Sequence, residues 1–220
     1  MPPPILVVDH HLGKSPIANP DGSVPATVTG CTVAKGPGAG AFGTLATALH
    51  FTGGGHVSAA PAPSLLDARR YCVRLVLRVT APVIGRNNLF ESSLPACSLQ
   101  VVPSAGRGQF RILGWVNNAR NGWDGVDTAN RTDLQLDRWF ILDFVCDTDT
   151  IGIFVDGELI ALSAFPDGTP KPSNTADLVL GIHPDLTRWP FTGEIALVQV
   201  WNGIPPVLEQ ALDDARGNPE

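Results

Sequence analysis

The chain has 220 residues, of which 23 are glycine and 20 are proline, and only 16% are charged. This composition excludes a long coiled coil, and the glycines do not recur every third residue as they do in collagen. Intrinsic disorder is excluded as well, because 44% of the residues are hydrophobic. We therefore expect a turn-rich globular protein, and residues 1–220 are predicted to form a single all-β domain.

The net charge of −6 results from 21 acidic and 15 basic residues, with no basic stripe along the chain. A nucleic-acid partner is therefore not expected. No apolar run approaches the ~20 residues of a membrane-spanning helix, so membrane insertion is not expected either. The first residues lack the basic region and long apolar segment of a secretory signal. The location is therefore left open between the cytoplasm, export by another route and a sequence that begins after a removed signal. Nothing in the sequence fixes the oligomeric state.

Short apolar or alternating runs separated by turn residues predict about a dozen strands. Residues 13–43 are expected to be irregular, with a loop at 36–40. Asp156-Gly157 predicts a tight hairpin, and Asp147-Thr148-Asp149 a second one. Helical spacing is found only near the end, over residues 206–216. In chain order the predicted strands are 5–8, 48–51, 56–58, 71–79, 88–92, 98–102, 109–115, 139–146, 151–155, 159–164, 178–181 and 195–202.

Five short motifs occur in a characteristic order in the second half of the chain. Trp139 opens a strand, a later strand ends in Val155-Asp156-Gly157, and Leu180-Gly181 follows. Phe191-Thr192-Gly193-Glu194-Ile195 then leads into Val198-Gln199-Val200-Trp201-Asn202. In the first half of the chain, Ala48-Leu49-His50-Phe51 is similar to the strand that precedes these motifs. Over about residues 45–215 this order resembles the laminin-G-like and pentraxin-like branch of the concanavalin A-like lectin/glucanase superfamily.

The resemblance implies a two-sheet antiparallel β-sandwich of the jelly-roll type, with the short predicted helix at the C-terminal end. Two sheets packed face to face need strands that alternate apolar and polar residues, and the predicted strands do so. Trp139 and Trp201 lie in such alternating runs, so we expect both to fill the core. Arg74 and Arg78 are expected to share one face of their strand.

Catalytic signatures are missing from the sequence. Glucanases of this superfamily carry Glu, Asp and Glu at alternating strand positions, because a retaining mechanism needs two carboxyl groups about 5 Å apart. None of the glutamates here belongs to such a triplet. No histidine occurs in a nucleophile context typical of Ser/His/Asp hydrolases. We expect a protein that is not an enzyme and that needs no cofactor.

A calcium site of the pentraxin type is a weaker prediction that the resemblance suggests. Asn87 and Asn88 stand where that family has an Asp-Asn pair, and Asp185 stands in the later acidic cluster, where His183 replaces an acid. Calcium prefers six to eight oxygen ligands, several of them anionic. One carboxylate and two amides supply fewer oxygen ligands than calcium prefers, which is why this prediction is the weaker one.

Two tryptophans in polar, glycine-rich segments predict a ligand-binding surface. Trp123 is flanked by Asn121, Asp124 and Asp127, and Trp189 by Asp185 and Arg188. An exposed aromatic ring beside carboxylates and amides suits stacking on a sugar. The alternative is that each tryptophan folds back to cover an edge of the sandwich.

The four cysteines, Cys31, Cys72, Cys97 and Cys146, show no metal-binding spacing. Cys72 and Cys146 lie in strongly apolar runs, which favours buried free thiols over a disulfide. Together these features favour a non-catalytic recognition module that binds a glycan through loops of a β-sandwich. The alternative is a structural or protein-interaction domain of a larger assembly.

Overall fold

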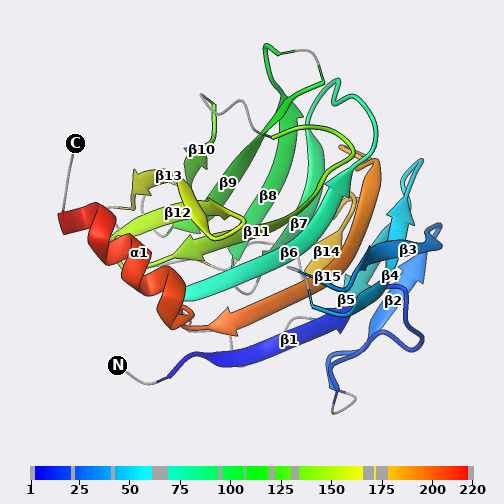
Figure 1. Cartoon of the computed structure of the whole chain (residues 1–220), viewed down its shortest axis with the longest axis horizontal. Helices are drawn as coiled ribbons and strands as arrows, with labels where there is room; N and C mark the ends of the chain where they lie inside the picture. Colours follow the sequence, from blue (N-terminus) through cyan, green and yellow to red (C-terminus); the bar gives the residue numbers. More distant parts are fainter. Residues whose placement is uncertain are drawn as a thin grey trace.

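The computed structural model describes residues 3–20, 23–40, 43–60, 69–93, 96–106, 108–118, 122–129, 134–165, 171 and 178–217. These residues form two antiparallel sheets that pack face to face (Figure 1), as the motifs predict. The eight-stranded first sheet runs in the order β13 (Glu158–Ala164), β12 (Thr150–Val155), β11 (Trp139–Cys146), β6 (Tyr71–Val79), β15 (Gly193–Asn202), β4 (Leu45–Phe51) and β3 (Thr32–Gly38), with β1 (Ile5–His11) paired to β15.

The second sheet has seven strands within the described residues. Its order is β10 (Gly122–Asp127), β9 (Phe110–Asn118), β8 (Ala96–Pro103), β7 (Asn87–Ser93), β14 (Leu178–Leu180), β5 (His56–Ala59) and β2 (Ala26–Thr29). Both sheets take strands from the early and the late parts of the chain. The fold therefore depends on pairings between segments that are distant in sequence, such as β14 with β5 and β15 with β4.

The main hydrophobic core lies between the sheets and follows the two-residue period of the strands. On β6, Val73, Leu75 and Leu77 are fully buried in this core, while Arg74 and Arg78 point to the opposite face, as their spacing predicts. The outward arginines are held by carboxylates: Arg74 Nε donates to Asp143 at 2.6 Å, and Arg78 Nε donates to Glu194 at 2.8 Å.

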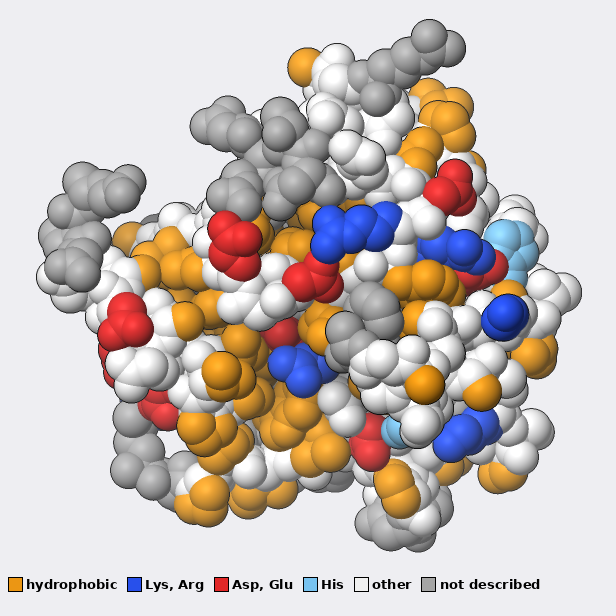
Figure 2. Space-filling model, in the orientation of Figure 1, with side chains coloured by type: hydrophobic (Ala, Val, Ile, Leu, Met, Phe, Trp, Pro, Cys, Tyr) orange, Lys and Arg blue, Asp and Glu red, His pale blue; other side chains and the backbone are white. Residues whose placement is uncertain are grey.

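The expectation that Trp139 and Trp201 fill the main core is wrong. Both are half-buried on the outer face of the first sheet, where the Arg78 guanidinium lies 5.3 Å from the Trp139 ring centre and that of Arg74 lies 5.5 Å from Trp201. They pack against two smaller hydrophobic clusters on that face. The reason is the strand register, because Trp139 pairs with Arg78, and Trp201 lies two residues after Gln199, which pairs with Arg74. Both rings therefore lie on the same outward face as the two arginines. Figure 2 shows this face, on which charged side chains interrupt the hydrophobic ones.

Helix α1 (Pro206–Gly217) packs on the outer face of the first sheet (Figure 1). Its two fully buried side chains, Leu208 and Leu212, join Cys72, Val145 and Phe154 in one cluster. Proline suits the first position of a helix, since the amide hydrogen that it lacks would have no partner there. The helix confirms the prediction for residues 206–216.

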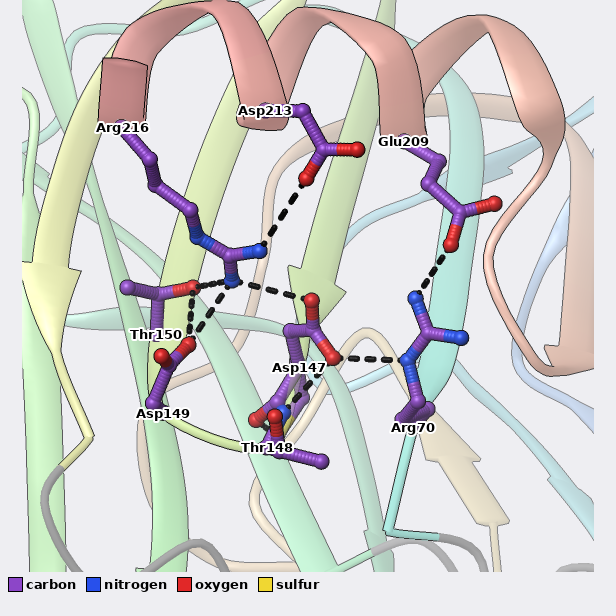
Figure 3. Close-up of polar contacts among 9 residues, drawn as sticks. Arg70, Asp147, Thr148, Asp149, Thr150, Glu209, Asp213 and Arg216 are labelled. Atoms are coloured by element: carbon purple, nitrogen blue, oxygen red, sulfur yellow. Dashed lines mark hydrogen bonds and ion pairs between the residues drawn. The ribbon is translucent and has the colours of Figure 1, made fainter. Parts of the chain in front are cut away.

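Polar contacts tie this helix to the β11–β12 hairpin (Figure 3). Asp147, which is 4% exposed, accepts from Arg70 Nε at 2.6 Å and from Arg216 at 2.9 Å. Arg70 also donates to Glu209 of the helix at 2.6 Å, and Arg216 reaches Asp149 in the hairpin turn at 2.9 Å. One buried carboxylate thus joins the start of β6, the hairpin and the last turn of the helix.

Both predicted hairpins are present. Val155 pairs with Glu158 across Asp156 and Gly157, which have φ values of 52° and 86°. Two consecutive residues with positive φ form the type I′ turn that an Asp-Gly pair favours. In the other hairpin, the amide of Asp147 donates to the carbonyl of Thr150 at 2.8 Å.

Three strands are missing from the sequence-based prediction. β2 and β3 lie in the segment that was expected to be irregular, and β3 includes Gly36, Pro37 and Gly38 of the expected loop. β10 replaces the loop that was expected around Trp123. All three are edge strands, whose outer sides need no hydrogen-bonding partner and therefore tolerate glycine, proline and polar residues.

The four cysteines all lie within the described residues, and each is a free thiol. Cys72, Cys97 and Cys146 are buried and Cys31 is partly exposed, so the free-thiol interpretation of Cys72 and Cys146 is confirmed. In the described parts of the chain, no helix combines the length and the apolar character needed to cross a membrane.

Candidate functional site

A pocket of about 300 Å³ lies on the outward face of the second sheet. It extends over four neighbouring strands, β7 to β10, and is bordered by the segment that follows β14. Volumes of this size are typical of small-molecule sites. The lining residues are Arg86, Glu91, Ser98, Gln100, Trp115, Trp123, His183 and Trp189.

The strand register brings the lining residues together. Glu91 on β7 pairs with Ser98 on β8, Ser98 pairs with Trp115 on β9, and Trp115 pairs with Gly125 on β10. Residues paired in this way point to the same face, so they form one row across the sheet. Gln100 lies two residues further along β8, and Trp123 two residues along β10 in the opposite direction. The lining residues therefore extend across four strands and to both sides of this row.

Gly125 makes room for the Trp115 indole. A Cβ atom built on Gly125 would stand 2.6 Å from both Cε3 and Cζ3 of Trp115, well inside a normal contact. The six-membered ring of the indole therefore lies against the backbone of β10. Trp123, on the same face of β10, is 42% exposed. Two indoles thus stand on neighbouring strands at this end of the pocket.

Buried polar side chains form the floor of the pocket. Gln100 Nε2 donates to Ser98 Oγ at 3.1 Å, and the Ser98 hydroxyl lies 3.3 Å from Asn88 Oδ1 and 3.4 Å from Glu91 Oε2. Among the described residues, Gln100 Oε1 and Trp115 Nε1 are buried without a hydrogen-bond partner. An unpaired acceptor and an unpaired donor of this kind each cost about 1–3 kcal/mol. The floor therefore favours a ligand that can satisfy both.

Glu91 is the carboxyl group of this floor and is 6% exposed. Burial raises the pKa of Glu91 above its ordinary value, although the positive potential of His183 and the hydrogen bond from Ser98 act in the opposite direction. The neighbouring Asp185 adds to the increase in the pKa of Glu91. A carboxyl group with a raised pKa keeps a proton to higher pH and can then donate a hydrogen bond as well as accept one.

A tight loop after β14 closes one end of the pocket. Asp185 accepts hydrogen bonds from the amide and the hydroxyl of Thr187, both at 3.0 Å, and from the Arg188 guanidinium. Desolvation would raise the pKa of Asp185, but the hydrogen bonds from Thr187 and Arg188 outweigh it and hold that pKa well below its ordinary value. These contacts fix the loop in which Trp189 adopts a φ of 56°, a conformation that costs energy for a residue with a side chain.

Trp189 is packed on several sides. Its ring makes an edge contact with His183, with ring centres 4.9 Å apart, and its carbonyl accepts from the amide of Asn88 at 2.8 Å. The guanidinium groups of Arg86 and Arg188 lie 5.5 Å and 5.0 Å from the ring centre. Trp189 therefore anchors two arginines and is less available for stacking than Trp123.

The ligand-binding residues expected from the sequence are only partly brought together. Trp123 and Trp189 line the same pocket, although they lie 66 positions apart in the sequence. Asp124 points to the other side of β10 from Trp123, because successive strand residues alternate, and it accepts from Asn118. Asp127 is on the same face as Trp123 but is paired with Arg111 at 2.6 Å. Asn121 lies outside the described residues.

The calcium site stays a prediction, but the contacts of its residues do not fit a cation. The Asp185 carboxylate is ion-paired with the positive Arg188 guanidinium. Asn88 donates to the carbonyl of Ile182 at 2.9 Å, and its own carbonyl oxygen faces the Ser98 hydroxyl. Asn87 begins β7 beside Val101. Within the described ranges, no group of three His, Cys, Asp or Glu side chains is placed to hold a metal ion.

Sequence reasoning missed Trp115 and the polar floor. Ser98 and Gln100 alternate with Cys97, Leu99 and Val101, which are buried in the main core. Polar residues at every second position of a strand indicate an outward face. That signal was present, but it cannot distinguish a solvated face from the floor of a pocket.

Comparisons with known proteins agree with this architecture. A laminin-G-type family model, described as the concanavalin A-like lectin/glucanases superfamily, matches residues 51–207. No curated protein matches the chain. One similar structure is domain 4 of AbnA, a GH43 extracellular arabinanase from Geobacillus stearothermophilus, in complex with arabinotriose. It has a TM-score of 0.66 and 17% sequence identity, and the match covers 96% of this chain and 98% of that domain.

Two botulinum neurotoxin domains are similar as well. The receptor-binding domain of the C/D mosaic serotype has a TM-score of 0.66 and 9% identity over 94% of this chain. The binding domain of neurotoxin DC in complex with SialylT has a TM-score of 0.63 and 8% identity over 97% of this chain. The chain spans 50% and 52% of these two domains. At such identities the structural likeness shows the fold alone. The family model, however, covers more than half of the chain, and the chain therefore belongs to the concanavalin A-like lectin/glucanase superfamily.

Proposed function

We propose that this protein is a non-catalytic recognition module that binds a carbohydrate in the pocket of the second sheet. The observation that carries the proposal is the pairing of two indoles, Trp115 and Trp123, with a buried polar floor in a pocket of about 300 Å³. Carbohydrates have apolar ring faces and hydroxyl edges, so they need aromatic and hydrogen-bonding groups in the same cavity. Mostly apolar walls with a few placed polar groups are typical of ligand sites.

The unpaired groups of the floor support a polyhydroxylated ligand. Gln100 Oε1 needs a donor and Trp115 Nε1 needs an acceptor. A sugar hydroxyl both donates and accepts, so two neighbouring hydroxyls can serve both atoms. Because both atoms are shielded from solvent, a small movement of the Gln100 or Trp115 side chain must accompany binding.

The fold neighbours add support to the proposal. The arabinanase domain with a similar fold is described in complex with arabinotriose, and one neurotoxin domain in complex with SialylT. The superfamily name covers lectins as well as glucanases, so it does not separate binding from catalysis. The site itself favours binding. Among the described lining residues Glu91 is the one carboxylate, whereas glycoside hydrolysis uses a pair.

A glycan array that includes neutral, acidic and arabinose-containing oligosaccharides tests the proposal. The intact protein should bind one or more related glycans, without releasing reducing ends. The variant Trp123→Ala should lose at least about tenfold in affinity at unchanged thermal stability, since this indole is 42% exposed and lies outside the main core. Trp115→Phe keeps a ring but removes the indole donor, and should weaken binding less than Trp115→Ala.

Trp139→Ala is the matched control, because this tryptophan lies on the outer face of the other sheet. It should leave glycan affinity unchanged even if stability falls. An array without hits, or hits that persist in Trp123→Ala and Trp115→Ala, would contradict the proposal. In that case a stable complex with a protein partner would favour the alternative of a protein-interaction domain.

A further inference from the structure

Arg86 is a cation on the pocket wall with an unusual position. It is exposed, directly precedes β7, lines the pocket and lies over the Trp189 ring at 5.5 Å. Trp189 is itself fixed by its edge contact with His183 and by its backbone bond to Asn88. The guanidinium therefore rests on a rigid surface.

A guanidinium in a cation–π contact still has N–H groups that can donate hydrogen bonds. Within the described parts of the chain, Arg86 has no ion pair and no hydrogen bond to a protein acceptor. Arg188, on the same tryptophan, differs in this respect because Asp185 neutralises it. A positive fork of donors that has no internal partner, held at the edge of a pocket, matches the two oxygens of a carboxylate.

The carboxyl group of Glu91 lines the same pocket, several residues along β7 from Arg86. Arg86 and Glu91 are five positions apart, but a bulge between Asn88 and Phe90 shortens this part of β7, so their Cα atoms are about 13 Å apart. Burial also raises the pKa of the Glu91 carboxyl, which favours its neutral form. The pocket is thus positive beside Trp189 and aromatic at the other end, beside Trp123.

We infer that the carbohydrate recognised by this pocket is acidic, with a carboxylate or sulfate held by Arg86 while its sugar rings contact Trp115 and Trp123. This inference rests on the proposed function. It adds the class of ligand and assigns Arg86 as the specificity-determining residue.

The test compares neutral, carboxylated and sulfated glycans on one array, followed by titration calorimetry with the strongest hit and its carboxyl-reduced or desulfated form. Acidic glycans should bind at least about tenfold more tightly than their neutral counterparts, and added salt should weaken their binding. Arg86→Gln should abolish this preference without changing thermal stability, and Arg86→Lys should restore part of it.

Arg69→Gln is the matched control, since it removes the same charge from an exposed arginine just before β6 on the other sheet. It should leave the preference intact. Neutral glycans that bind as tightly as acidic ones, or a preference that survives Arg86→Gln, would overturn the inference while leaving carbohydrate binding in place. An array without any hit would refute the proposed function and this inference together.

Discussion

Replacing Gly125 with alanine should displace the Trp115 indole without touching the ligand directly. The new Cβ atom would stand 2.6 Å from two carbons of the indole, about 0.8 Å short of the 3.4 Å at which ordinary contacts begin. Gly125 has no positive φ that would add backbone strain. The ring must therefore shift or tilt, and the effect of the substitution acts through Trp115.

The size of the effect can be worked from the position of the site. Overpacking in a core costs about 1–3 kcal/mol, and the lower end applies here because Trp115 is only half-buried on an outer face. Loss of the stacking surface and of the indole donor should weaken glycan binding by about 1–2 kcal/mol, which is roughly 5- to 30-fold in Kd. Binding should thus fall more clearly than stability.

Titration calorimetry with the best array glycan and urea unfolding measure the two effects. The decisive comparison is a double-mutant cycle with Trp115→Ala. Once the indole is absent, Gly125→Ala should cost almost nothing further in either affinity or stability. If Gly125→Ala leaves glycan affinity unchanged, or if its effect is the same with and without Trp115, the assignment of this indole to the site is refuted.

Asp147→Asn should lower the free energy of unfolding by about 2 kcal/mol at neutral pH, because the carboxylate bonds of Arg70 and Arg216 are lost. Desolvation raises the pKa of Asp147, but hydrogen bonds from the Thr148 amide and the two arginines outweigh it, so the pKa is lowered. In urea unfolding, the stability difference between the protein and the Asp147→Asn variant should therefore shrink as the pH falls below about 4. The control Asp149→Asn, at an exposed position, should cost far less. Glu91→Gln should stabilise the protein at neutral pH and have little effect near pH 4, because a raised pKa makes stability fall as the pH rises. Equal melting temperatures of both forms across this range would contradict the burial argument. Calcium up to millimolar concentration should leave the melting temperature unchanged. An increase in the melting temperature with calcium would support the calcium prediction.

The sequence predicts the fold well because central strands carry strong local signals. β6 and β11 match their predicted bounds, since both are predominantly apolar over a full strand length. β10 was missed because its Gly122, Asp124 and Gly125 have low strand propensity, and its pairing with β9 depends on a partner rather than on its own residues.

The site was predictable only in part, for a related reason. Trp123 and Trp189 are noticeable in sequence because they interrupt polar segments. The strand register determines on which face each of the other residues lies. It places Asp124 on the opposite face from Trp123, and it places Ser98, Gln100 and Trp115 on the same face as Trp123. Register is set by long-range pairing, which no local pattern contains.

The alternation along β7 to β10 also separates the residues that pack the core from the residues that line the pocket. On β8, Leu99 and Val101 hold the sandwich together while Ser98 and Gln100, between them, face the pocket. Substitutions at the outward positions should therefore change the shape and polarity of the pocket, while the inward positions keep the two sheets packed together.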